Sequence, residues 1–242
     1  MPKKSVFVKI ILNKKPKNSI IINGFPGFGF VASIALEFLI DHLKVEQIGK
    51  MVLEEMPAMV AIHDKKMMDP FGIFYNAKYN IIILHAIAPV HGLEWKIADF
   101  VIDLAGKVQP REIISIEGVA SSSPDSSKTY YYTNNKKNQA KFEKANIEAL
   151  KEGIIIGVAG ALLMKADSLP LSMVFAETHS TLPDSKAAAQ IIRTLDKYLG
   201  LNVDYDPLLK QAESFEQKLQ QIMKKGIEAT ELSEQKKLSY VG

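Results

Sequence analysis

The 242-residue chain contains no cysteine. It therefore forms no disulfides, holds no metal through thiolates and has no cysteine nucleophile. Arginine is also scarce, since Arg111 and Arg193 are the only arginines among 30 basic residues. Surfaces that bind nucleic acid usually cluster arginine and lysine on one face. Here the lysines are spread from Lys3 to Lys237 and alternate with acidic residues, so we expect a solvated surface and no nucleic-acid partner.

Long hydrophobic runs are absent as well. No apolar run reaches the roughly 20 residues that are needed to span a bilayer. The chain begins with Met1-Pro2-Lys3-Lys4 and continues with a short strand-like run, which differs from the apolar core of a signal peptide. These features predict a cytoplasmic protein without a membrane partner.

The remaining composition is that of one large α/β domain. Hydrophobic residues make up 47% of the chain and charged residues 24%, which is ordinary for a globular protein. At this length folding removes roughly 70–75% of the unfolded chain's surface, so a core forms without a metal or disulfide. We expect a folded domain over residues 1–205, an amphipathic helix over 206–226 and a flexible tail over 227–242.

Short β-rich runs alternate with amphipathic segments along the folded part. The expected strands cover residues 6–12, 19–23, 56–63, 81–87, 113–118, 154–160 and 171–176. The expected helices run from the glycine-rich turn to Leu43, from 94 to 108, and from 184 to 199. This alternation predicts a three-layer α/β/α sandwich with a largely parallel sheet.

In such folds, ligands bind beyond the carboxyl ends of the strands. Three loops therefore need attention, namely those over residues 24–29, 118–127 and 177–183. The first has the glycine content of a phosphate cradle, but no Gly-Lys-Ser/Thr follows and the G-x-G-x-x-G pattern is missing. Its aromatic residues, Phe25 and Phe28, favour a structural turn or a protein-contact loop. If the loop does bind a ligand, the residues expected to contact it are Gly24, Phe25, Pro26 and Gly27.

The best catalytic-looking cluster is Glu177-Thr178-His179, with Asp184 a few residues later. A carboxylate beside an imidazole can orient it as a general base. No nucleophile-elbow or metal-binding spacing accompanies the cluster. Polar residues at strand ends also cap the following helix, and we favour that interpretation over a catalytic one.

Tyr130-Tyr131-Tyr132 leaves two alternatives open. The three rings could form an exposed adhesive patch, or a strand whose alternate rings pack inward. We favour the strand.

The chain after Asp206 changes character. Apolar residues recur at steps of four and three, in the heptad-like series Leu208, Ala212, Phe215, Leu219 and Ile222. This stripe could pack on its own domain or contact another subunit. The sequence ends on Leu238, Ser239, Tyr240, Val241 and Gly242, a small apolar and aromatic cluster of the kind that a peptide presents to a partner's pocket. The alternative is a frayed terminus.

The combination resembles the PAC2 (proteasome assembly chaperone 2) family. The features that carry the resemblance are the run from Gly24 to Gly29 with Val31, Ser33 to Ala35 and Leu39-Ile40, then Pro57, Gly118, the run from Ile156 to Leu163, and Glu177-Thr178-His179 with Pro183-Asp184 and Ala187-Ala188.

The resemblance implies an α/β/α sandwich like that of nucleoside phosphorylases, without established catalysis and without a cofactor. It also implies a homo-oligomer, a tetramer or pentamer, that helps to assemble proteasome α subunits. Members that dock on the proteasome end in a hydrophobic residue, a tyrosine and any residue. Here Tyr240 is third from the end, Ser239 precedes it, and Val241-Gly242 follow.

Three hypotheses follow. In the first, the protein is a non-enzymatic homo-oligomer whose tail binds proteasome α subunits. In the second, it is a scaffold or adapter whose tail binds another protein. In the third, it is an enzyme, a hydrolase or transferase, or a binder that takes a nucleoside or small anionic ligand between the Gly24–Gly29 loop, His85 or His91, and Glu177 to His179.

Overall fold

Four parallel strands form the centre of a nine-stranded sheet in the computed structural model, which describes residues 8–56, 58–63, 65–120, 128–166, 168–178, 182–210, 221 and 224–225. These strands are β7 (Ile81–Ala86), β2 (Ile20–Gly24), β8 (Glu112–Ala120) and β11 (Leu171–Thr178), in that spatial order. Every residue of β2 and β7 is buried. Such continuous apolar runs are typical of parallel strands that are covered on both faces.

The outer strands run mostly antiparallel to their neighbours. On one side β6 (Phe71–Asn76), β3 (Glu46–Leu53) and β1 (Val8–Leu12) follow β7, each antiparallel to the last. On the other side β9 (Thr129–Thr133) pairs antiparallel with β11, and the short β10 (Glu148–Ala149) pairs parallel with β9. The prediction of a largely parallel sheet is therefore confirmed for the centre, and the edges add antiparallel strands.

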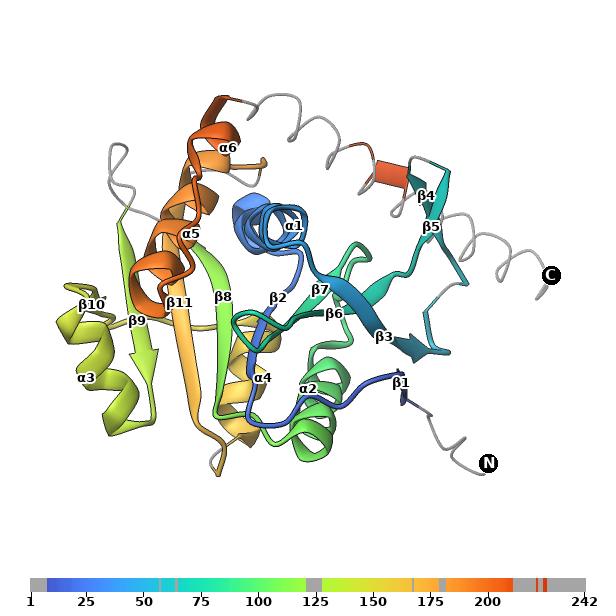
Figure 1. Ribbon diagram of the computed structural model, residues 1–242, viewed down its shortest axis with the longest axis horizontal. Coiled ribbons are helices and arrows are strands. Elements are labelled where there is room, and N and C mark those ends of the chain that lie inside the picture. The colour runs from blue at the N-terminus through green and yellow to red at the C-terminus, as the bar shows by residue number, and fades with distance from the viewer. Residues whose placement is uncertain are drawn as a thin grey trace.

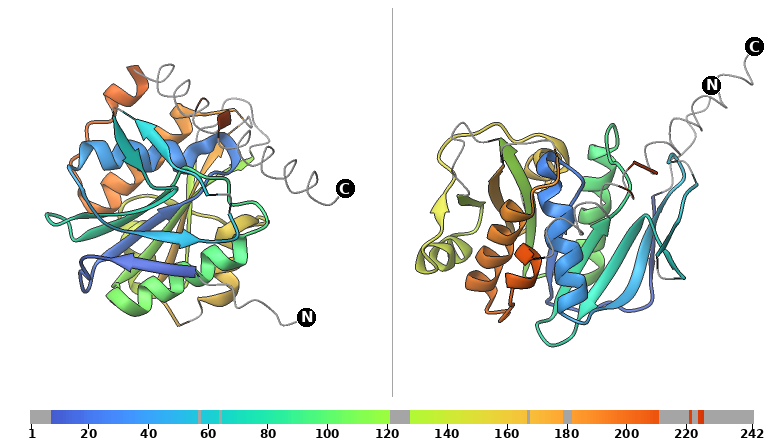
Figure 2. Two further views of the ribbon diagram at one scale, coloured as in Figure 1. Left: turned by 90° about the vertical axis from the view of Figure 1, so that its right-hand side faces the viewer. Right: turned by 90° about the horizontal axis from the view of Figure 1, so that it is seen from above.

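Helices cover both faces of the sheet (Figures 1 and 2). On one face lie α1 (Val31–His42) and α5 (Ser185–Leu199), which pack side by side, with α6 (Asp206–Lys210) next to α5. On the other face α2 (Glu94–Val108) packs against α4 (Gly157–Lys165). Each helical layer and its sheet face form one apolar core. The α/β/α sandwich expected from the sequence is confirmed.

Two smaller elements lie at opposite ends of the molecule. The helix α3 (Lys136–Lys144) packs beside β9, while β4 (Ala61–His63) and β5 (Lys66–Met68) form a two-stranded antiparallel hairpin beyond β3 (Figure 1). The strand expected over 56–63 is thus confined to Ala61–His63. Among the described residues, no helix combines the length and apolar character needed to cross a membrane.

The expected strand over residues 154–160 is wrong. Residues 154–156 have no regular structure, and Ile154 and Ile156 are 91% and 79% exposed. The helix α4 then begins at Gly157, whose φ of +78° is a conformation that glycine adopts without steric cost. The turn at Gly157 therefore directs the chain into a helix before the apolar run can join the sheet.

The tyrosine run forms β9, as the favoured interpretation predicts. Tyr131 points into the core and stacks on Phe142, whereas Tyr132 is 44% exposed. The rings thus alternate between core and solvent, as they do on any strand with one covered face.

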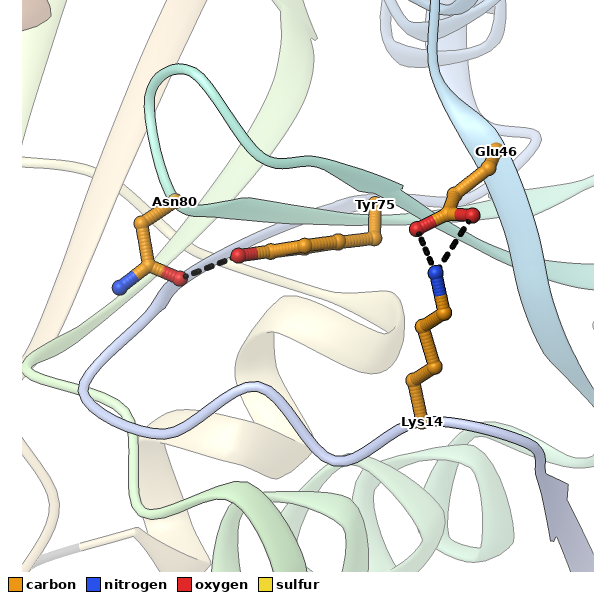
Figure 3. Close-up of polar contacts among 4 residues, drawn as sticks. All are labelled: Lys14, Glu46, Tyr75 and Asn80. Atoms are coloured by element: carbon orange, nitrogen blue, oxygen red, sulfur yellow. Dashed lines mark hydrogen bonds and ion pairs between the residues drawn. The ribbon is translucent and has the colours of Figure 1, made fainter.

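Polar contacts hold the turns at the amino ends of the central strands. The Lys14 ammonium lies 2.6 and 2.8 Å from the two Glu46 carboxylate oxygens, and the Tyr75 hydroxyl donates to Asn80 Oδ1 at 3.1 Å (Figure 3). The Asn80 amide in turn donates to the carbonyls of Lys17 and Asn18. Lys14 thus ties the connection between β1 and β2 to the start of β3, and Asn80 ties it to the turn between β6 and β7. Both contacts lie far from the carboxyl ends of the central strands.

Candidate functional site

The strands β2, β8 and β11 are neighbours in the sheet, and the loop that follows β2 lies against the ends of β8 and β11. That loop contains the short 3₁₀ helix η1 (Phe28–Phe30) and leads into α1. A side chain at Gly118 would place its Cβ 2.1 Å from the carbonyl oxygen of Phe28, so β8 and this loop touch backbone to backbone. At Gly29, φ is +64° and a Cβ would lie 2.7 Å from Thr178 Oγ1. The glycines therefore permit close packing, which supports the structural interpretation of the loop.

The end of β11 is held to the start of α5 by polar contacts. Thr178 is buried, and its hydroxyl donates to Asp184 Oδ2 at 2.7 Å. The other Asp184 oxygen accepts the backbone N–H of Ala187 at 2.9 Å, which caps α5 as predicted. Asp184 also donates its backbone N–H to the Gly29 carbonyl at 2.9 Å. This favours the capping interpretation of the Glu177–His179 cluster over the catalytic one.

The other described members of that hypothetical site contact different neighbours. The Tyr130 hydroxyl donates to Glu177 at 3.3 Å, and His179 lies outside the described residues. His85 is buried on β7, with its Nε2 atom 3.5 Å from Glu37 of α1. Burial lowers the pKa of His85 more than the charges of Glu37 and Asp41 raise it, so the imidazole is neutral at pH 7.

A cleft of about 600 Å³ opens at the carboxyl edge, on the α2 and α4 side of the sheet. Three of its walls are the predicted ligand loop, the start of α2 and the segment that precedes α4. Its lining is mostly apolar and comprises Phe25, Pro26, Gly27, Phe28, Val90, His91, Glu94, Glu117, Gly118, Val119, Ala120, residues 154–158 and Phe175. Of the sequence-predicted residues, Phe25, Pro26, Gly27 and His91 therefore reach the cleft, whereas Gly24, His85 and Glu177 do not line it.

Glu117 is the lining residue that the sequence did not single out. It is half-buried near the end of β8, and its carboxyl group makes no hydrogen bond or ion pair with any other described residue. Burial raises the pKa of Glu117 from an ordinary 4.5 to about 8. The carboxyl is therefore largely protonated at pH 7, and a raised pKa in a cleft marks a candidate functional group. Its position inside the apolar run from Ile113 to Gly118 was the only signal for it in the sequence.

Replacing Glu117 by glutamine should stabilise the folded protein at high pH. Because the pKa is higher in the folded state than in the unfolded chain, ionisation costs stability as the pH rises from 4.5 through about 8. We expect Glu117→Gln to gain about 2 kcal/mol over the native protein at pH 9 and almost nothing at pH 5, allowing for partial screening by water in the open cleft. Urea unfolding at both pH values measures the difference.

The exposed Glu148 on β10 supplies the control for this measurement. Glu148→Gln should leave the stability within about 0.5 kcal/mol at either pH. An equal effect of Glu117→Gln at pH 5 and pH 9 would contradict the assignment of a raised pKa.

Of the residues predicted for the C-terminal stripe and tail, only Leu208 is among the described residues. Leu208, the first residue of the heptad-like stripe, is 2% exposed and belongs to the core of its own chain. Leu208 therefore packs on its own domain, one of the two alternatives for the stripe, and a role of the stripe between subunits stays a prediction. Ala212, Phe215, Leu219 and Ile222 lie outside the described residues, as do all five tail residues from Leu238 to Gly242.

Comparison with known proteins identifies relatives over nearly the whole chain. The family model for the PAC2 family matches residues 21–223. The crystal structure of Pyrococcus furiosus PbaA, an archaeal homolog of proteasome-assembly chaperone, has a TM-score of 0.82 and 31% identity, covering 92% of this chain and 99% of that chain.

More distant relatives share the fold. Pyrococcus furiosus PbaB, an archaeal proteasome activator, has a TM-score of 0.72 at 22% identity, covering 89% of this chain and 98% of that chain. An uncharacterized protein of Methanocaldococcus jannaschii is 26% identical over 211 residues, which are 85% of this chain and 86% of the relative.

Proposed function

The chain belongs to the PAC2 family, and from this membership we propose that it is a non-enzymatic, chaperone-like protein that forms homo-oligomers and holds a protein partner through its C-terminal tail. The observation that carries the proposal is the match to PbaA, which is 31% identical over almost its entire length. Because PbaA is an archaeal homolog of proteasome-assembly chaperone, the proposed partners are proteasome α subunits. A different protein client is the alternative.

The polar chemistry of the carboxyl edge supports a non-enzymatic role. Thr178 and Asp184 are tied to each other and to the backbone, so neither is placed to attack a substrate. In addition, the described lining of the cleft contains neither lysine nor arginine, which disfavours the nucleoside-phosphate or other anionic ligand of the enzyme hypothesis.

Exposed apolar residues on the β4–β5 hairpin support self-association. Val60, Ile62 and Met67 all face solvent on this small two-stranded projection. A monomer rarely exposes neighbouring large apolar side chains, whereas a subunit interface covers them. We propose that contacts of this kind, with those from the stripe Ala212, Phe215, Leu219 and Ile222, assemble a tetramer or pentamer.

Assembly would give the tail its strength. Several copies that project Leu238, Tyr240 and Val241 from one oligomer bind a multimeric client more firmly than one copy does. The gain is on the order of 10²–10⁴ when the spacing matches. The displaced Tyr240 then needs only weak affinity at each subunit of the client.

The test is a tagged pull-down from native cell extract with the full-length protein and a version that lacks residues 238–242. The full-length protein should capture its client, and the truncated version should not, because the anchoring side chains are gone. Native mass spectrometry should give the same oligomer for both. Proteasome α subunits in the captured fraction support the assembly role, whereas another client supports the scaffold alternative.

Single substitutions sharpen this test. Tyr240→Ala should abolish capture, whereas Ser239→Ala should preserve it, because a serine hydroxyl adds little apolar contact. Equal capture by the full-length and truncated proteins would refute the tail mechanism, and a truncated protein that is monomeric would show that the tail serves assembly instead.

A further inference from the structure

Acidic side chains outnumber basic ones in the described lining of the cleft at the carboxyl edge. Its described lining contains two glutamates, Glu94 and Glu117, and one histidine, His91, but no lysine or arginine. Glu94 accepts the backbone N–H of Gly92 at 3.0 Å, and His91 Nδ1 lies 3.6 Å from the same carboxyl while its ring remains exposed to solvent. His91 is therefore at the rim of the cleft, with the Glu94 carboxyl beside it.

Among the described residues, no cationic side chain forms an ion pair with Glu117. Phe175 is its Cα partner on β11, and Glu177, two residues further, projects from the same face of the sheet. The glycine-rich loop beside it contributes no titratable group, since it comprises Phe25, Pro26, Gly27 and Phe28. The start of α4 supplies about half a positive charge, which is less than the charge of one ionised carboxylate. The cleft thus favours a cation over an anion.

The rest of the lining suits an apolar body. Phe25, Val90, Val119 and Ile155 contribute aromatic and aliphatic surface to the same lining. Aromatic faces also attract ammonium groups within about 6 Å. The volume of about 600 Å³ falls within the range of sites for small molecules.

We propose that this cleft binds a small organic cation, in which a protonated amine pairs with the Glu117 carboxylate and an apolar or aromatic body fills the space beside Phe25. Glu94 at the rim adds a second negative charge that attracts the amine. No bond is made or broken. The proposal uses none of the tail residues, so it does not rest on the chaperone-like function and can fail or succeed without it.

Proton release is the signature of such binding. Near neutral pH the half-buried carboxyl carries a proton, and the ammonium group displaces that proton when it forms the ion pair. Affinity should therefore rise between pH 6 and pH 8, by about 50-fold if the carboxyl titrates near pH 8.

Three probes of matched shape test the idea on the full-length protein by isothermal titration calorimetry. They are phenethylamine, 2-phenylethanol and phenylacetate, which carry a positive, a neutral and a negative group on the same ring. At pH 8 phenethylamine should bind at least tenfold more tightly than 2-phenylethanol, and phenylacetate should give no measurable heat. Titration in two buffers that differ in ionisation enthalpy counts the protons released.

Two variants locate the site. Glu117→Gln keeps the shape of the side chain, and it should weaken phenethylamine binding at least tenfold at pH 8 and abolish the pH dependence. Glu148→Gln, on the exposed edge strand β10, should bind as the native protein does. Urea unfolding of each variant verifies that it is folded.

Several results would overturn the proposal. They are equal binding of the three probes, no binding of phenethylamine up to about 10 mM, unchanged affinity in Glu117→Gln, and equal weakening by Glu148→Gln. The last result would indicate ion pairing anywhere on the surface instead of a built cleft.

Discussion

Replacing Gly118 by alanine should destabilise the protein by about 3 kcal/mol, at the upper end of the usual cost of overpacking. The new Cβ atom would lie 2.1 Å from the Phe28 carbonyl oxygen and 3.0 Å from Val31 Cγ2. The nearest atom belongs to the backbone, so relief requires η1 to move away from β8 and cannot come from a side-chain rotation. Urea unfolding measures the loss as a lower midpoint with an unchanged slope.

Gly106 is the matched control for this substitution. It lies in the interior of α2, and a Cβ atom there would have no other atom within 4 Å. Gly106→Ala should therefore stabilise the protein by about 0.5–1 kcal/mol, since alanine restricts the unfolded chain and favours the helix. The two Gly→Ala changes thus have opposite expected signs. A Gly118→Ala protein as stable as the native one would show that the loop and β8 are not in contact.

A movement of η1 away from β8 would also change the cleft. Gly118 and Phe28 both line it, and a Cβ at Gly27 would lie 3.4 Å from Glu117 Oε2. The contact between Gly118 and Phe28 therefore sets the width of the space beside the Glu117 carboxyl. A glycine in the loop motif and a glycine at the end of β8 together shape the candidate site.

Local periodicity was sufficient to predict the central elements of the fold. The helix over Glu94–Val108 was predicted with the bounds that the structure gives, because its apolar residues recur at helical spacing and Pro110 follows its end. Strands β2 and β7 are equally plain, since they are short runs of isoleucine with almost no polar residue. Such segments have one favourable arrangement, in which both faces are covered.

Elements at the edges of the sheet carry weaker signals. The strand β3 (Glu46–Leu53) mixes glutamate, glutamine and lysine with apolar residues, because half of it faces solvent. The helix α3 is mostly polar and buries little beyond Phe142, and the side chain of its N-cap, Asn135, was the only local mark of its start. For these segments the tertiary contacts, and not the local pattern, decide the structure.

The location of the candidate site could be predicted from the sequence, but most of the residues that line it could not. The turn from Gly24 to Gly29 indicated the correct edge of the sheet, because loops at strand carboxyl ends meet there. The importance of Glu117 depends on Val119, Phe175 and residues 154–156, which come from three distant parts of the chain. A glutamate in a strand is usually exposed, and only the assembled lining buries this one.

Phe142→Ala should be the most destabilising single change proposed for this chain, at about 4 kcal/mol. The ring is fully buried between Tyr131 and Tyr198, with centroid distances of 4.5 and 3.9 Å and nearly parallel planes. Its removal leaves a cavity between α3, β9 and α5 and loses two stacking contacts. The Tyr198 hydroxyl also donates to the buried Glu112 carboxylate. The Tyr198 ring therefore cannot move into the cavity without breaking that contact.

Tyr132→Ala is the control, because Tyr132 lies next to Tyr131 in sequence but is 44% exposed, and it should cost at most about 0.5 kcal/mol. Unfolding followed both by the fluorescence of Trp95, on α2 at the opposite face, and by far-ultraviolet circular dichroism adds a second test. If residues 1–205 form one cooperative domain, both signals should shift together in Phe142→Ala. A shift in the dichroism alone would show instead that α3, β9 and β10 unfold as a separate unit. This edge of the sheet would then not belong to the cooperative domain.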